Sequence, residues 1–391
     1  MDAGSLSSVR TEGLKRAVAQ TDRVAMNTDN ALKIGLFGAN CSSGRAATKV
    51  PERWSAHWGE CLELARMADQ ARIDFLLPIG RWKGYGGETD LQGETLETLT
   101  WATGLLGATE RITIFGTVHA PLFHPLIAAK QCVTADQVGG GRFGLNIVCG
   151  WNEGEFEMFG AQQRDHESRY AYAQEWVDIV KLAWTKQEDF DYRGNFFDLH
   201  GVRAYPKPVG GSRPVIMNAG GSPVGQAFAL RNCDAFFTAT ASSRLSIEEN
   251  TRTIRGIKDA ASAMGRETEV FTVGQVICRT SKAEAQDYYQ HAIVDEADWD
   301  AIDSMLANRG MTPQNTPADE FREKRIACAR LGVGGYPFIG TPDDIAGELD
   351  NLRRAGLRGI AISFVNYLDE FPLFRDEVLP RLEDLGSRAR R

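Results

Sequence analysis

The chain has 391 residues, with 44 Lys or Arg against 52 Asp or Glu, which gives a formal net charge of −8 at pH 7. This acidic balance argues against a basic face for nucleic acid. No apolar run approaches the roughly 20 residues needed to cross a bilayer, so no membrane partner is expected. With 43% hydrophobic residues, we expect a soluble globular protein with a sizeable core.

The amino terminus and the cysteines favour a cytoplasmic protein. Residues 1–30 lack the apolar stretch of a secretory signal and are interpreted as a polar extension. The seven cysteines are odd in number and form no CxxC pair, which is typical of reduced thiols. His119 and His124 are five residues apart, which fits no common metal-ligand spacing, so no metal is expected.

From residue 32 onward, short apolar runs alternate with longer amphipathic segments, the pattern of βα units around a parallel sheet. Helices are expected near 58–68, at 96–108, at 168–184, and after Thr341, which fits a helix cap. The predicted strands are 32–38, 72–78, 111–118, 143–148, 214–219, 233–238, 270–279 and 357–364. Eight such strands predict an α/β fold of the (β/α)₈ TIM-barrel type, although a doubly wound sheet would show the same periodicity.

Two segments interrupt this alternation within a single domain that spans residues 31–391. Residues 186–213 are too long for an ordinary connection and are rich in aromatics, so they are expected to contain a small hairpin. Residues 295–338 form a second irregular insertion. Both insertions are expected to contribute to the lining of the pocket.

Polar residues near the carboxyl ends of the predicted strands are candidates for function, because barrel active sites lie at that end. Thr117 ends the third strand and is followed by His119. Asn146 lies in the fourth strand, and Trp151 and Glu155 come shortly after it.

The segment AGGSPVGQAF places Gly221 and Ser222 at a strand-to-helix turn, where backbone N–H groups and the helix dipole bind phosphate. A tight turn with Ser222 as a helix cap explains the same residues equally well. Arg169 would add a cation to such a site, although a solvated surface charge is its commoner role. The motifs of a Rossmann site, a P-loop and a nucleophile elbow are absent, and their absence disfavours a cofactor-free hydrolase.

The run GGGRFGLNIVCGWNEGEFEMFG, followed by DHESRYAYAQEWVDIVKLAW and then by YRGNFFDL and NAGGS, resembles the luciferase-like flavin monooxygenases. Within them it is most similar to the branch that contains pyrimidine oxygenase and dimethyl sulfone monooxygenase. The resemblance runs from Leu32 to the C-terminus. It implies a luciferase-like barrel enzyme that takes reduced FMN from a separate NAD(P)H:flavin reductase and uses O₂.

Such an enzyme would oxygenate a small amide, C–N, C–S or heteroaromatic compound through a flavin N5- or C4a-peroxide. The resemblance also implies a homodimer or homotetramer. Two alternatives remain open: a deazaflavin (F420)-dependent dehydrogenase of the same superfamily, and a non-catalytic flavin-binding relative.

The positions of the motifs that carry the resemblance imply roles for individual residues. The implied flavin contacts are Gly80, Arg81, Asn146, Glu155, Arg169, Tyr170, Gly221 and Ser222. The implied O₂ pocket is formed by Leu77, Thr117 and Asn146. Gly80 before Arg81 departs from the pyrimidine branch, which has a bulky apolar residue before a lysine, so the substrate of that branch is not transferred.

Four further residues are candidates with ordinary structural alternatives. His119 is a candidate acid or base, because an imidazole titrates near working pH, but it also fits a structural histidine. Trp82, Tyr85 and Trp151 are candidate substrate-pocket residues that would stack on a planar molecule. Core packing is the alternative for each of these aromatics.

Overall fold

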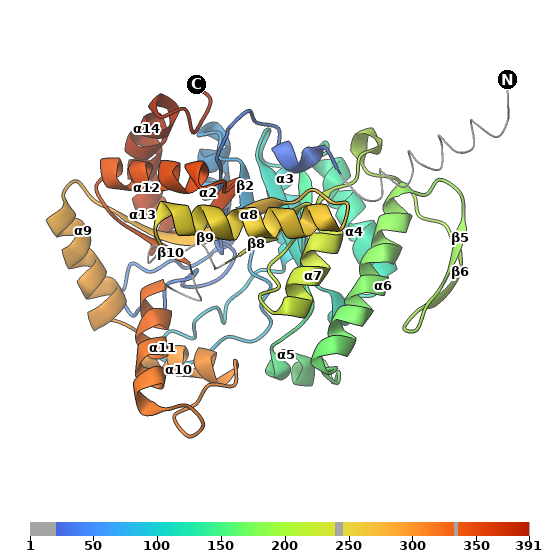
Figure 1. The fold of residues 1–391 in the computed structure, drawn as a ribbon, viewed down its shortest axis with the longest axis horizontal. Helices are drawn as coiled ribbons and strands as arrows, with labels where there is room; N and C mark the ends of the chain where they lie inside the picture. Colours follow the sequence, from blue (N-terminus) through green and yellow to red (C-terminus); the bar gives the residue numbers. More distant parts are fainter. Residues whose placement is uncertain (1–20, 239–244, 332–334, 391) are drawn as a thin grey trace.

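Eight parallel strands close into a barrel ringed by helices (Figure 1). The computed structural model describes residues 21–238, 245–331 and 335–390. The barrel strands are β1 Lys33–Phe37, β2 Phe75–Leu77, β3 Thr113–His119, β4 Phe143–Val148, β7 Val215–Asn218, β8 Ala235–Phe237, β9 Glu269–Cys278 and β11 Gly359–Ser363. All eight predicted strands are present. The prediction of a TIM barrel is therefore confirmed.

The long strand β9 closes the ring. Its residues 269–271 pair with β8, and its residues 271–275 pair with β11, which in turn pairs with β1. The order around the barrel is β1-β2-β3-β4-β7-β8-β9-β11. A doubly wound sheet would leave two open edges, so this closure excludes the alternative topology.

The second predicted strand extends well beyond the observed one. Residues 72–78 were expected to be extended, but β2 covers only Phe75–Leu77. Arg72 has a φ of 56°, and its N–H donates to the carbonyl of Asp69, so it belongs to the turn that ends the preceding helix. Apolar periodicity does not reveal such a left-handed residue.

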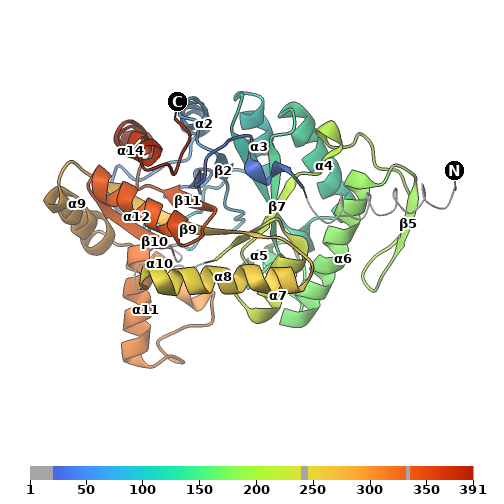
Figure 2. The same ribbon diagram turned by 45° about the horizontal axis from the view of Figure 1, so that its top comes forward.

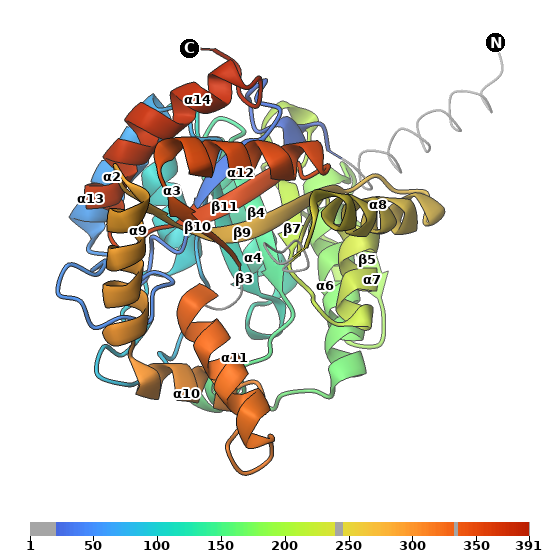
Figure 3. The ribbon, with the colours of Figure 1, turned by 60° about the vertical axis from the view of Figure 1, so that its left-hand side comes forward.

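Helices surround the strands on the outside (Figure 3). Thr341 caps α12 as predicted: its hydroxyl accepts from the N–H of Asp344, whose carboxylate accepts from the Thr341 N–H. The helices between or after the barrel strands are α2 Trp58–Gln70, α3 Thr98–Leu106, α4 Pro125–Val138, α6 His166–Thr185, α7 Pro223–Asn232, α8 Ile247–Ala263, α12 Pro342–Arg354, α13 Tyr367–Leu373 and α14 Leu379–Asp384. No helix among the described residues is long and apolar enough to span a membrane.

The insertion at 186–213 contains the expected hairpin, formed by β5 Phe190–Arg193 and β6 Asp198–Val202, which lies outside the barrel (Figure 2). The insertion at 295–338 holds α10 Trp299–Ala307 and α11 Ala318–Leu331. It ends in β10 Tyr336–Gly340, which pairs with the second half of β9 and was not predicted. These two helices lie at the same end of the molecule as α5 Glu153–Met158 (Figure 1).

The predicted polar extension is described only from residue 21, and residues 1–20 lie outside the described part of the chain. Residues 21–30 contact the barrel of the same chain. Met26 is buried against Phe75 and Val215 inside the barrel, and Arg23 forms an ion pair with Asp136 of α4. This segment therefore covers the amino-terminal end of the strands.

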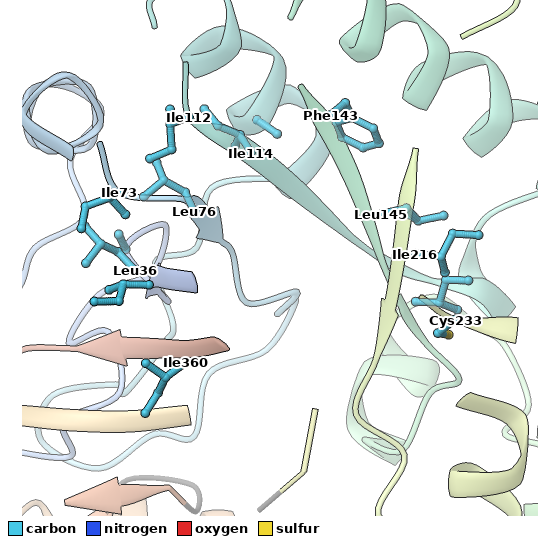
Figure 4. Close-up of a cluster of buried hydrophobic side chains, with 14 of the residues drawn as sticks. Leu36, Ile73, Leu76, Ile112, Ile114, Phe143, Leu145, Ile216, Cys233 and Ile360 are labelled. Atoms are coloured by element: carbon cyan, nitrogen blue, oxygen red, sulfur yellow. The ribbon is translucent and has the colours of Figure 1, made fainter. Parts of the chain in front are cut away.

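Two apolar layers hold the barrel together. Outside the strands, residues such as Leu36, Leu76 and Ile114 pack beneath the helices (Figure 4). All seven cysteines lie in the described residues, and each is buried and free. Inside the barrel, aromatic rings fill the space as a separate cluster that includes Phe75, Phe115 and Phe271.

Glycines make room for these rings. Gly144 of β4 lies in register with Phe115 of β3, and a Cβ at Gly144 would overlap the Phe115 ring. The pairs Gly35–Phe75 and Gly359–Phe271 repeat the arrangement on other neighbouring strands. The interior is thus filled by rings that each require a glycine beside them.

The substitution Gly144→Ala should destabilise the protein by about 1–3 kcal/mol, because the added methyl group forces the Phe115 ring to move in a filled core. Gly347→Ala in α12 is the control, since a Cβ there has no atom within 4 Å. The free energy of unfolding from denaturant titration measures both effects. Equal stability of the two variants would contradict this account of the core.

Candidate active site

A cavity of about 960 Å³ opens among the loops at the carboxyl ends of the strands. This volume lies near the upper end of the range of roughly 300–1,000 Å³ for small-molecule sites. Five residues selected from the sequence contribute to its wall: Leu77, Arg81, Asn146, Trp151 and Gly221. The barrel therefore brings side chains from distant parts of the chain to one cavity.

The turn between β7 and α7 forms one side of this cavity. Ser222 is the N-cap of α7, and its hydroxyl accepts from the N–H of Gly225 at 3.1 Å. A Cβ at Gly225 would overlap the hydroxyl of Tyr170, so α6 and α7 approach closely here. The backbone N–H groups of Gly221 and Ser222 have no acceptor among the described residues. Such N–H groups at a helix start are suited to an anion.

Arg169 lies beside this turn and is joined to it through His166. An Nη of Arg169 lies 3.0 Å from Nδ1 of His166, whose Nε2 lies 3.0 Å from the Ser222 hydroxyl. A second Nη donates to the carbonyl of Gly150, whereas the buried Nε of Arg169 has no partner among the described residues. Arg169 is thus held at the turn rather than solvated as an ordinary surface charge.

His166 was not selected from the sequence. It precedes Arg169 by three residues, so the two side chains share one face of α6, and this spacing is the signal that identifies it.

Asn146 and Thr117 lie side by side on β4 and β3. They are in register, and Nδ2 of Asn146 donates to Oγ1 of Thr117 at 3.2 Å. The Thr117 hydroxyl donates in turn to the carbonyl of Pro78 at 2.6 Å. Only Asn146 of this pair lines the large cavity. The second N–H of the Asn146 amide and its carbonyl oxygen do not bond to Thr117, so these groups are available to a ligand in the large cavity.

Thr117 instead lines a smaller cavity of about 40 Å³ together with Gly80, Trp82 and His119. A Cβ at Gly80 would lie 2.7 Å from Cε1 of His119 and 3.1 Å from a methyl carbon of Thr117. Glycine is therefore required here for the close approach of the loop after β2 to side chains of β3. Trp82 makes an edge contact with Phe159, with ring centroids 5.1 Å apart.

Glu155 organises the wall between the two cavities. Its Oε1 accepts from the backbone N–H of Trp82 at 2.9 Å and from Arg81 at 3.2 Å. Arg81 also donates to the Tyr85 hydroxyl at 2.8 Å, and its guanidinium lies over the rings of Tyr85 and Trp151. The carboxylate neutralises Arg81 and fixes its direction, which compensates for the burial of both charges.

His119 is buried behind Thr117. Its Nε2 lies 3.6 Å from Oε2 of Glu155. Burial lowers the pKa of His119 to about 4, and this effect outweighs the opposing influence of Glu155. The imidazole is therefore neutral at neutral pH and faces Glu155 as a dipole rather than as a cation.

His119 should show no protonation between pH 8 and pH 5.5. Because its folded pKa lies below the ordinary value of 6.5, protonation favours the unfolded chain, and stability declines as the pH falls from about 6.5 towards 4. Long-range ¹H–¹⁵N NMR spectra of histidine-labelled protein measure the titration, with His119→Asn used to assign the signal. A midpoint near 6.5 would contradict the buried neutral imidazole.

The sequence reasoning missed two arginines of the cavity. Arg45 lies in the loop after β1, and Arg309 follows α10 in the insertion at 295–338. The carboxyl-end rule that selected Asn146 also applies to the loop containing Arg45, so a signal existed for that residue. Nothing local distinguishes Arg309. The described residues contain no cluster of three or more metal-ligating side chains.

Comparison with known proteins gives relatives along nearly the whole chain. A model of the luciferase-like monooxygenase family matches residues 32–359. The chain is 27% identical to the FMNH(2)-dependent dimethylsulfone monooxygenase of Pseudomonas fluorescens (strain Pf0-1), over 93% of this chain and 97% of that protein. It is 26% identical to the pyrimidine monooxygenase RutA of Enterobacter sp. (strain 638), over 90% and 96%.

Solved structures share the fold. The crystal structure of riboflavin lyase RcaE, with modified FMN and riboflavin, matches with a TM-score of 0.82 at 21% identity over 92% of both chains. The family model covers every barrel strand from β1 to the start of β11. The chain therefore belongs to the luciferase-like monooxygenase family.

Proposed function

We propose that this chain is the oxygenase of a two-component, FMN-dependent monooxygenase. It would receive reduced FMN from a separate NAD(P)H:flavin reductase and oxygenate a small heteroatom-containing organic molecule. Family membership and the relatives named FMNH(2)-dependent dimethylsulfone monooxygenase and pyrimidine monooxygenase support this reaction class. Assembly as a homodimer or homotetramer is part of the same proposal.

The observation that carries the cofactor proposal is the polar turn at one side of the large cavity. The buried Nε of Arg169 and the N–H groups of Gly221 and Ser222 have no acceptor among the described residues. A phosphate group would accept from all three, at the positive end of the α7 dipole. Tyr170, whose hydroxyl lies against Gly225, belongs to the same site. These residues fit the phosphate of FMN.

The remaining cavity residues would hold the flavin ring and the substrate. Bound reduced FMN supplies two electrons, so that one atom of O₂ enters the substrate and the other leaves as water. Asn146 presents an amide to the cavity, and Leu77 lines it as an apolar neighbour. Thr117 acts as a positioning residue, because its hydroxyl is bonded to Pro78 and holds the Asn146 amide in one orientation.

The wall formed by Glu155 would keep the site ordered and dry. Glu155 fixes Arg81 between Tyr85 and Trp151, and neutral His119 packs behind it. Because His119 is uncharged at neutral pH and is buried beside Glu155, we assign it a structural role in preference to proton transfer. The substrate would lie on the apolar part of the cavity wall.

The cofactor proposal is tested by comparing FMN with riboflavin, which lacks the phosphate. Arg169→Ala should weaken FMN binding by about tenfold or more, because a charge-assisted hydrogen bond to the phosphate is lost, and should leave riboflavin binding unchanged. Isothermal titration or quenching of flavin fluorescence gives both dissociation constants.

Arg66→Gln on the exposed face of α2 is a control for the change in net charge. An equal loss of FMN and riboflavin affinity in Arg169→Ala would mean that the variant distorts the cavity. Absence of FMN binding by the unaltered protein in both redox states would refute the proposed function.

The oxygen-handling role is tested by the rate at which O₂ oxidises protein-bound reduced FMN in stopped-flow experiments. Asn146→Ala should lower this rate at least about tenfold, since single preorganised donors typically contribute 10²–10³. Thr117→Val should give a smaller change in the same direction. FMN affinity should change less than about threefold in both variants.

Thr134→Val, which removes an exposed hydroxyl from α4, is the matched control. Rates equal to that of the unaltered protein in both site variants would remove Asn146 and Thr117 from the oxygen pocket. The same experiment distinguishes the proposed oxygenase from a deazaflavin-dependent dehydrogenase, which would transfer hydride and would not require O₂.

A further inference from the structure

The turn that contains Gly221 and Ser222, between β7 and α7, is called the phosphate-type turn below. Two arginines, Arg45 and Arg309, line the cavity on the side opposite this turn. In the closed ring, β1 and β7 are four strands apart in either direction, so the loops that follow them face each other across the mouth. Ser222 follows β7, whereas Arg45 follows β1. Arg309 joins Arg45 from the insertion after β9. If the flavin phosphate occupies the β7 side, Arg309 and the neighbouring Arg45 give the opposite side of the cavity a positive charge.

The described residues that line the cavity include three arginines and no Asp or Glu. Arg81 forms an ion pair with Glu155. Arg309 forms no ion pair with any carboxylate in the described parts of the chain. Arg45 is 3% exposed. Burial lowers its pKa to about 10, the nearby charge of Arg309 lowers it as well, and the side chain remains protonated at neutral pH.

Like charges that converge on a partly buried cavity are costly unless an anion joins them. Guanidinium groups bind carboxylate and sulfonate oxygens in pairs, which makes Arg suited to such a ligand. Arg45 is also held in one direction, because its guanidinium lies 5.1 Å above the ring of Phe37. The site is therefore preorganised for a planar or branched oxyanion.

The cavity wall beside Arg45 is apolar. Phe37, Ile79 and Val273 line the cavity and lie near the Arg45 side chain. An oxyanion alone would leave this surface without a partner, whereas an organic acid with an apolar body would cover it.

We infer that the substrate is a small organic acid whose carboxylate or sulfonate group is bound by Arg45 and Arg309, with its apolar part directed towards Asn146. This inference rests on the proposed function, which places the flavin on the β7 side. It identifies the two arginines as residues that determine substrate specificity.

Binding of matched probes tests the inference. Benzenesulfonate and benzoate are titrated calorimetrically into the full chain, with and without oxidised FMN, and compared with the neutral benzenesulfonamide and benzamide. The anions should bind at least about tenfold more tightly than the neutral probes. Arg309→Gln, on an exposed residue, and Arg45→Gln should each weaken anion binding about tenfold, while Arg66→Gln should not.

Three results would overturn the inference. In the first, the anions bind no more tightly than the neutral probes, or do not bind at all. In the second, Arg309→Gln leaves the affinity for the anions unchanged. In the third, Arg309→Gln weakens the binding of FMN but not of riboflavin, which would assign the flavin phosphate to the arginine side. Failure of the proposed function looks different: the unaltered protein would bind the anions in an arginine-dependent way but would take up no FMN.

Discussion

Closure of the barrel by β9 is the constraint on which the site depends. One strand pairs with β8 through its first residues and with β11 through its middle, and this double pairing joins the two ends of the sheet. Closure brings all carboxyl ends to one rim and places the loops after β1 and β7 on opposite sides of it. The phosphate-type turn and the arginine side of the cavity owe their separation to this geometry.

Within that frame, one buried carboxylate organises the wall of the cavity. Glu155 accepts from Trp82 and Arg81 and faces His119, so a single charge orders residues of the loop after β2 and of β3. As a consequence, the two parts of the site differ in charge. Arg81 is neutralised within the protein, whereas the cavity surface near Arg45 and Arg309 has no carboxylate among its described residues.

The two sides of the cavity are also built from different parts of the chain. Of the flavin contacts that the resemblance implied, those on α6 and on the turn before α7 lie together at the phosphate-type turn. Arg309 comes from an insertion outside the barrel strands. The two sides of the cavity therefore depend on different segments of the chain, one next to the barrel strands and one in the insertion at 295–338.

The sequence by itself determined the eight strands, the hairpin in the first insertion and the cap at Thr341, because apolar periodicity and capping are local properties of the chain. It also selected Asn146, Arg169 and Ser222, since motif spacing identifies residues without coordinates. Only the tertiary structure decided that β9 closes the ring, that Thr117 lines the small cavity and not the large one, and that Arg309 lies near Arg45. These facts depend on contacts between residues far apart in the chain, and no local pattern encodes them.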